Sequence, residues 1–180
     1  MLKVIARHEA DLQTPSVLDR TRFLAALATV ESSGGRNWQP NFEAGFWEGG
    51  LYWNVALAAY RDRWRKAADP EMAEWCGKAI ACSWGPWQLL YVTAAELGYE
   101  GPPWGLSDAD VCLKWVVALI NKRLVPRLQA PLTDLGAVGM LADGYNSGTF
   151  LDTHVPFAYV QKVRAAYLDP GTLSRLSSLE

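Results

Sequence analysis

The stretch SVLDRTRFLAALATVESSGG, from Ser16 to Gly35, decides the fold class. Residues 17–31 contain neither glycine nor proline, and Ser16 followed by Asp19 resembles a capping box, so the sequence predicts a helix over 17–31. The two glycines at the end of the stretch favour termination, because glycine readily adopts the left-handed conformation that ends helices.

The predicted helix carries a carboxylate at the last position of a stripe that is otherwise suited to burial. Val17, Leu24 and Glu31 repeat at seven-residue intervals, with Thr21 and Ala28 between them. Burial and the partial negative charge of a helix C-terminus would both raise the pKa of Glu31. A carboxyl group that stays protonated suits proton donation to a glycosidic oxygen, whereas a surface glutamate at a frayed helix end is the alternative.

The rest of the chain predicts further helices and no convincing strand. The expected helices cover residues 51–68, 69–80 (from Asp69-Pro70), 87–97, 111–124, 132–141 and 155–168. A short hairpin is allowed only within 37–50, and residues 143–148 are expected to form a loop. The sequence therefore predicts one all-helical domain over residues 1–180 with the apolar helix 111–124 at its centre.

Composition restricts the function classes. Seventeen Lys and Arg against 19 Asp and Glu give a net charge of -2, which disfavours nucleic acid as a partner. No apolar run is long enough for a transmembrane helix, and the charged N-terminus lacks a signal-peptide core. The odd set of cysteines, Cys76, Cys82 and Cys112, is expected to be reduced core thiols, and no paired spacing indicates a metal site.

Aromatic residues are the one compositional anomaly. Nine Trp and seven Tyr exceed what a core of this size needs, and flat aromatic faces stack against sugar rings. Two or three of the tryptophans in or beside predicted loops are expected to be sugar platforms. These tryptophans are Trp38, Trp47, Trp84, Trp87 and Trp104.

Four motifs appear in a fixed order. They are ATVES at 28–32, SWGPWQL at 83–89 followed by TAAELG at 93–98, YNSG at 145–148, and YVQKV at 159–163. In this order they resemble the lysozyme-like superfamily, in particular the soluble lytic transglycosylase type of domain. The resemblance implies a mainly helical fold with a catalytic cleft.

Three departures qualify the resemblance. The separation of Glu31 from Gly85 is longer than in compact members of the family, so residues 51–80 look like a helical insertion. The segment NFEAGFW at 41–47 is instead similar to a stretch of phage-type N-acetylmuramidases, the endolysin class. Pro86 and Trp87 also replace the apolar pair that is usual before the glutamine.

The resemblance implies cleavage of the β-1,4 bond between N-acetylmuramic acid and N-acetylglucosamine. Glu31 would act first as acid and then as base. Attack by the muramoyl C6 hydroxyl gives a lytic transglycosylase, whereas attack by water gives a hydrolytic lysozyme with a second carboxylate. Candidates for that carboxylate are Glu43, Glu48 and Asp143.

The substrate-binding residues also follow from the resemblance. Ser83, Tyr145 and Asn146 would hold Glu31 and the N-acetyl group, and Gln88 would line the cleft; each is also a residue type common in turns or helix starts. Glu43, Trp84 and Trp87 complete the candidate set. The chemistry requires no metal and no organic cofactor.

The expected partner is the glycan strand of peptidoglycan, bound by a monomer. Without a signal peptide, the enzyme would be made in the cytoplasm and reach the bacterial cell wall through phage lysis, on a virion, or within a larger protein. Two alternatives stay open: an inactive wall-binding or virion structural module, and a chitinase-like member of the same superfamily.

Overall fold

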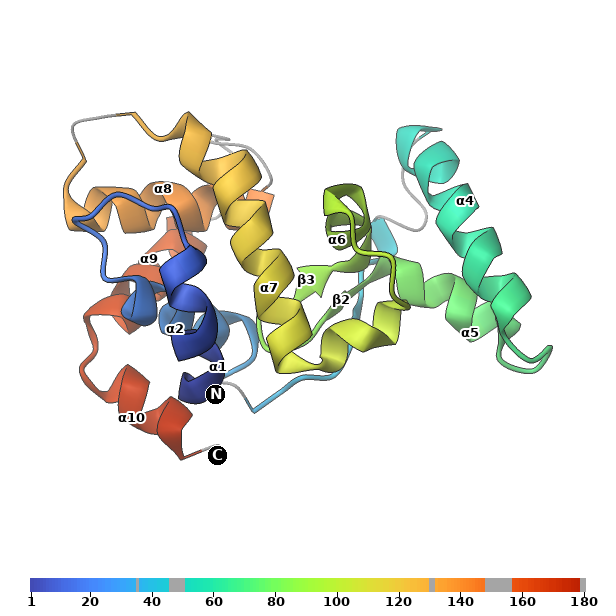
Figure 1. Ribbon diagram of the computed structural model, residues 1–180, viewed down its shortest axis with the longest axis horizontal. Helices are drawn as coiled ribbons and strands as arrows, with labels where there is room; N and C mark the ends of the chain where they lie inside the picture. The colour runs from blue at the N-terminus through green and yellow to red at the C-terminus, as the bar shows by residue number, and fades with distance from the viewer. Residues whose placement is uncertain (35, 46–50, 130–131, 148–156, 179–180) are drawn as a thin grey trace. The chain divides into compact units, whose positions relative to one another are not determined.

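The computed structural model describes residues 1–34, 36–45, 51–129, 132–147 and 157–178, without the side chains of 51–57 and 157 (Figure 1). The chain is mainly helical and has one small antiparallel sheet of three strands in the order β1-β2-β3, as expected for an all-α fold with a short hairpin. Its internal contacts define two compact units. Unit 1 comprises Met1–Asn37 and Val116–Glu180, and unit 2 comprises Trp38–Trp115.

All regular secondary structure in the described residues of unit 1 is helical. Its elements are α1 (Leu2–His8), η1 (Glu9–Asp11), α2 (Arg20–Glu31), the π-helical turn η4 (Ile120–Leu124), η5 (Val125–Arg127), α8 (Asp134–Ser147), α9 (Phe157–Leu168) and α10 (Gly171–Ser177). Helix α9 packs against both α2 and α8 (Figure 1). Phe23, Leu24 and Leu27 of α2 are fully buried, as is Val163 of α9, so these two helices form the centre of the unit 1 core.

Unit 2 contains the sheet and the remaining helices. Its elements are β1 (Asn41–Phe42), α4 (Leu51–Ala67), α5 (Ala73–Lys78), η2 (Ala79–Ala81), β2 (Cys82–Trp84), β3 (Leu89–Leu90), α6 (Tyr91–Leu97) and η3 (Pro103–Ser107). Strand β2 is central: Ser83 faces Asn41 of β1 on one side and Leu90 of β3 on the other. Helix α7 (Ala109–Leu119) contributes residues to both units.

Several predicted helices are confirmed with shifted boundaries. Helix α2 ends at Glu31 as expected but begins at Arg20, because Asp19 and not Ser16 is its N-cap. The Asp19 Oδ1 accepts a 3.0 Å hydrogen bond from the Arg22 amide, and Val17 lies exposed outside the helix. Helix α4 fits its prediction to one residue, and α7 continues into the π-helical turn up to Leu124.

The hairpin was expected in the wrong place. The described residues of 37–50 contain the strand β1, and the hairpin turn lies between β2 and β3, where the sequence predicted a helix from Trp87. Helix α6 therefore starts at Tyr91. The helix expected from Asp69 also starts late, at Ala73, because the Met72 amide bonds the Asp69 carbonyl in a turn at 2.9 Å.

The prediction of a loop at residues 143–148 is wrong for residues 143–147, which the structure describes. Residues 143–147 continue helix α8, and Gly148 lies outside the described residues. The buried face of α8, which includes Leu141 and Gly144, packs against α9, and this burial outweighs the local turn preference of the polar residues. Ser147 accommodates the helix by donating its hydroxyl to the Asp143 carbonyl at 2.8 Å. Helices α1 and α10 were not predicted.

The cysteine prediction is confirmed: Cys76, Cys82 and Cys112 are free and buried. Burial raises the pKa of the Cys112 thiol to about 12. Within the described ranges, no helix combines the length and apolar character needed to cross a membrane. One domain with a helical insertion at 51–80 stays a prediction.

Candidate functional site

Glu31 occupies the last helical position of α2, and the chain beyond it is tightly fixed. The Ser32 side chain is buried and donates to the Ala28 carbonyl at 2.7 Å. Ser33 adopts a left-handed conformation with φ of +53°, and the Gly34 amide reaches back to the Thr29 carbonyl at 2.8 Å. This closure is a Schellman motif with serine at the position that glycine usually takes, and it holds the half-buried Glu31 side chain at a defined helix end.

The Glu31 carboxylate has a phenol as a direct partner. The Tyr159 hydroxyl, from α9, donates a short hydrogen bond to Glu31 Oε1. Burial raises the pKa of Tyr159 well above its ordinary value, and the charge and hydrogen bond of Glu31 raise it further. Tyr159 therefore remains a neutral donor to the carboxylate. The sequence placed Tyr159 in a motif but gave it no role, since a contact between residues 128 positions apart leaves no local signal.

Unit 2 brings together three of the predicted site residues. The Ser83 Oγ, on β2, lies 3.0 Å from Gln88 Oε1 and 3.4 Å from Glu43 Oε1, so its single proton serves either acceptor. Asn41 donates to the same Glu43 oxygen at 2.6 Å. Burial, and then the charge of Glu43, raise the pKa of the neighbouring Cys82 thiol to about 11. Residues of two neighbouring strands, Asn41 of β1 and Ser83 of β2, therefore hold the Glu43 carboxylate in place.

Gln88 is the centre of this network and is held in a strained conformation. Its φ is +46°, in the left-handed region that residues other than glycine rarely adopt. The Gln88 side chain folds back over the turn, where its Nε2 donates to the Gly85 carbonyl at 2.9 Å and to the Gln39 carbonyl at 3.4 Å. The prediction of Gln88 as a helix-start residue is wrong, and the structure brings its side chain into contact with Ser83, while a role in a cleft stays a prediction. The sequence did not identify Gln39 and Asn41 as members of this hydrogen-bond network.

Gly85 makes the tight turn possible. Its φ is +71°, and a Cβ built there would lie 2.5 Å from the Leu106 carbonyl oxygen and 2.9 Å from Cys112 Sγ. Only glycine fits this position without displacement of the backbone of η3. The Ser83 and Gln88 side chains meet because this turn is close against the buried end of α7.

The remaining predicted site residues of unit 1 lie on a helix. Tyr145 and Asn146 belong to the last turn of α8 and not to a loop. Asp143 belongs to the same helix, and its role as a second carboxylate stays a prediction. Its carbonyl accepts the Ser147 hydroxyl. Since α8 packs on α9, Tyr145 and Asn146 are on the element next to the helix that carries Tyr159.

The prediction that Trp84 and Trp87 are sugar platforms is wrong. Trp84 is 2% exposed and Trp87 is fully buried, so neither indole offers a face to a ligand. Trp84 also uses its Nε1 to donate to the Ala79 carbonyl at 3.1 Å. Both side chains are core residues of unit 2. Trp38 and Trp104 are exposed as expected, and Trp47 and Glu48 lie outside the described residues.

The structure divides the predicted site residues into two groups. Glu31, Tyr145, Asn146 and Tyr159 belong to unit 1, while Glu43, Ser83 and Gln88 belong to unit 2. In the part of the chain that the structure describes, no group of three or more His, Cys, Asp or Glu side chains is arranged to hold a metal ion. No protein-family model, curated protein or solved structure matches this chain.

Proposed function

We propose that this chain is a peptidoglycan-cleaving glycosidase that acts on the β-1,4 bond between N-acetylmuramic acid and N-acetylglucosamine. The observation that carries the proposal is the hydrogen bond from Tyr159 to Glu31, at the end of α2. A single carboxyl group that is half-buried and oriented by a neutral phenol suits general acid and base catalysis. The order of the four sequence motifs supports the same assignment.

In this mechanism Glu31 delivers a proton to the glycosidic oxygen. Because Tyr159 engages Oε1, the proton is assigned to Oε2. The C–O bond to the leaving sugar breaks, and the resulting carboxylate takes the proton of the attacking hydroxyl. Attack by the C6 hydroxyl of the same muramoyl residue closes a 1,6-anhydro ring and consumes no water. Glu31 then returns to its protonated state, so one residue performs both transfers.

The unit 2 network is assigned to substrate binding. The N-acetyl group of each sugar offers one amide N–H and one carbonyl, and Ser83 and Gln88 provide a hydroxyl and a carboxamide of matching chemistry. Their positions are fixed by the turn at Gly85 and by the strained Gln88 backbone, so little ordering is needed on binding.

A hydrolytic reaction is the second candidate, and the order around Glu43 favours it. Asn41 and Ser83 hold this half-buried carboxylate through Oε1. An inverting hydrolase needs a second carboxylate to activate water, and Glu43 is assigned that role in this alternative. Glu43→Gln separates the two reactions, since it abolishes a hydrolytic reaction and leaves a transglycosylase reaction largely intact.

The test compares clearance of a peptidoglycan suspension by the wild type, Glu31→Gln and Tyr159→Phe. Glu31→Gln should lower the rate by about 10²- to 10⁴-fold, the usual contribution of an acid or base. Tyr159→Phe should lower it less, and Tyr167→Phe, a matched change in the same helix, should leave it unchanged. Mass spectrometry of the fragments then distinguishes anhydro ends from reducing ends, which differ by one water. Equal clearance by the wild type and Glu31→Gln would contradict the proposal and favour an inactive wall-binding or structural module.

A further inference from the structure

Unit 2 exposes two large aromatic side chains next to each other. Trp75 of α5 is 46% exposed and Trp104 of η3 is 39% exposed, and their ring centroids lie 5.8 Å apart with the planes tilted by 34°. Met72, 48% exposed, precedes α5. We define Met72, Trp75 and Trp104 as the indole patch. None of these residues belongs to the Glu31 or Ser83 groups.

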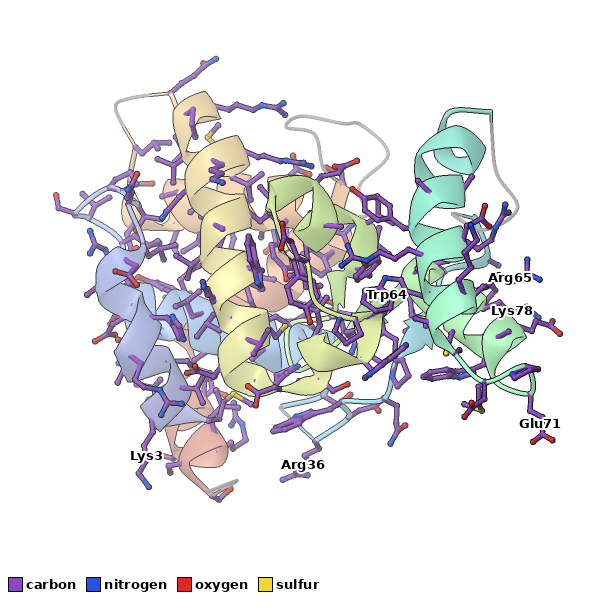
Figure 2. All side chains as sticks on the ribbon, turned by 45° about the vertical axis from the view of Figure 1, so that its right-hand side comes forward. Lys3, Arg36, Trp64, Arg65, Glu71 and Lys78 are labelled. Carbon is purple, nitrogen blue, oxygen red and sulfur yellow. The ribbon has the colours of Figure 1, made fainter. Side chains whose placement is uncertain are left out.

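The two exposed indoles each pack against another tryptophan of unit 2, which holds them in place. Trp75 packs edge-on against the buried Trp84 at 6.4 Å, and Trp104 packs edge-on against Trp64 at 5.8 Å. Trp64 in turn donates its Nε1 to the Tyr91 hydroxyl at 2.7 Å. Figure 2 shows Trp64 directed from α4 towards the body of unit 2, while Arg65 and Lys78 point away from it. The exposed rings therefore have fixed positions before any ligand binds, which lowers the entropic cost of binding.

The patch is too small for a stable protein interface. Three side chains that are each about half exposed offer on the order of 300 Å² of accessible area, from the usual size of buried aromatic side chains. A stable protein interface takes roughly 800 Å² from each partner. A ligand that fits the indole patch is therefore narrow, and it binds by stacking on the two indole faces more than by burying a large apolar area.

Charged residues lie near Trp75 in the sequence of α5. Glu74 and Lys78, one residue before and three residues after Trp75, form an exposed ion pair at 2.7 Å, and the hydrogen bond from Lys78 lowers the pKa of Glu74. Sugars present apolar C–H faces to indoles and hydroxyl or amide groups to charged side chains around them. The separation of the two ring centroids is also comparable to that of successive pyranose rings in a β-1,4-linked chain.

We infer that the indole patch binds a β-1,4-linked N-acetylhexosamine chain, the chemistry that peptidoglycan and chitin share. The patch is an accessory glycan site, distinct from the residues proposed to cleave the chain. It would hold the polymer on unit 2 whether or not Glu31 is catalytic. This binding chemistry agrees with the proposed function but does not depend on turnover.

Binding is measured in the full-length Glu31→Gln protein, so that the polymer stays intact if the wild type cleaves it. Co-sedimentation with purified sacculi and titration with soluble chitohexaose are the two arms. Trp75→Ala and Trp104→Ala should each weaken binding about tenfold, the scale of one aromatic contact with its burial. Binding in both arms assigns the shared sugar chemistry, and binding to sacculi alone assigns peptidoglycan.

Matched variants separate ring stacking from general apolarity. Trp104→Tyr keeps an aromatic face and should retain most of the affinity, whereas Trp104→Leu should lose about as much as the alanine variant. Leu168→Ala removes an exposed apolar side chain from unit 1 and should have no effect. Affinity unchanged in the double Trp75→Ala, Trp104→Ala variant, or lowered equally by Leu168→Ala, would overturn the inference.

A measurement that needs no substitution at the indole patch tests the inference even if the tryptophan variants fail to fold. Titration of the Glu31→Gln protein with chitohexaose should shift the indole N–H resonances of Trp75 and Trp104, while that of the buried Trp87 stays in place. If chitohexaose binds, unchanged resonances of the two exposed indoles at saturation would also overturn the inference. Failure of catalysis would show separately, as equal clearance by the wild type and Glu31→Gln.

Discussion

Gly85→Ala tests whether the turn that brings Ser83 and Gln88 together is as close-packed as the structure has it. The substitution adds one methyl group at a residue with φ of +71°. That group would lie 2.5 Å from the Leu106 carbonyl oxygen and 2.9 Å from the sulfur of the fully buried Cys112. A backbone atom and a buried side chain have little freedom to move, so both contacts require displacement of η3 or α7.

The magnitude follows from two contributions. The left-handed backbone costs an alanine roughly 1–2 kcal/mol, and forcing a methyl group into a packed core costs typically about 1–3 kcal/mol. Gly85→Ala should therefore lower the free energy of unfolding by about 2–5 kcal/mol. Gly34→Ala is the matched control, because Gly34 has a similar φ of +78° but no heavy atom within 4 Å of the added Cβ. It should cost only about 1–2 kcal/mol.

Urea unfolding followed by tryptophan fluorescence measures both variants. The double variant Gly85→Ala, Cys112→Ala removes the sulfur contact and should recover part of the loss, with a coupling energy of about 0.5 kcal/mol or more. The Leu106 carbonyl contact remains, so recovery should be incomplete. If Gly85→Ala costs no more than Gly34→Ala, the close approach of the turn to η3 is refuted.

Two further predictions concern unit 1. The pKa of Tyr167 is raised to about 12, first by burial and then by its hydrogen bond to Asp134. The neutral phenol therefore contributes fully to stability below pH 10, and this contribution is lost as pH rises towards 12. Tyr167→Phe should make the fall in unfolding free energy over this pH range shallower, and an unchanged slope would contradict this. Removal of the α2 N-cap by Asp19→Ala should cost about 1 kcal/mol in urea unfolding, because the Arg22 amide loses its acceptor. Asp19→Asn keeps an acceptor and should lose less than half of that, so equal losses would argue against the capping bond.

Long helices could be predicted from the sequence because their signals are local. Residues 17–31 contain no helix breaker, and two glycines follow, so the end of α2 at Glu31 was predicted correctly. Asp108 directly precedes α7 and is a residue type that favours helix N-caps, and its Oδ1 accepts the Asp110 amide at 2.8 Å. The start of α2 was misplaced because Ser16 and Asp19 are both good caps, and local sequence does not choose between them.

The sheet and the C-terminal part of α8 could not be predicted for different reasons. Strands β2 and β3 are three and two residues long, too short for any alternation of polar and apolar residues to be recognised. Residues 143–147 are turn-forming types, and they are helical because α8 buries Gly144 while packing against α9. Trp84 and Trp87 were read as exposed because glycine and proline lie between them, yet the turn folds both indoles into the core.

The candidate site was predictable in its membership more than in its geometry. Ser83, Gln88 and Glu43 were all selected from motifs, and the structure adds that they share one hydrogen-bond network. The partnership of Glu31 with Tyr159 depends on the packing of α2 against α9, which joins distant parts of the chain. Such long-range pairing has no signature in a single sequence.

Unit 2 is one continuous segment, whereas unit 1 is assembled from residues on both sides of it. During translation the ribosome releases α2 and then all of Trp38–Trp115 before α9 is made. Glu31 and Tyr159 are therefore synthesised on opposite sides of the unit 2 segment. The hydrogen bond between the two side chains can therefore form only after the whole intervening unit 2 segment has been synthesised.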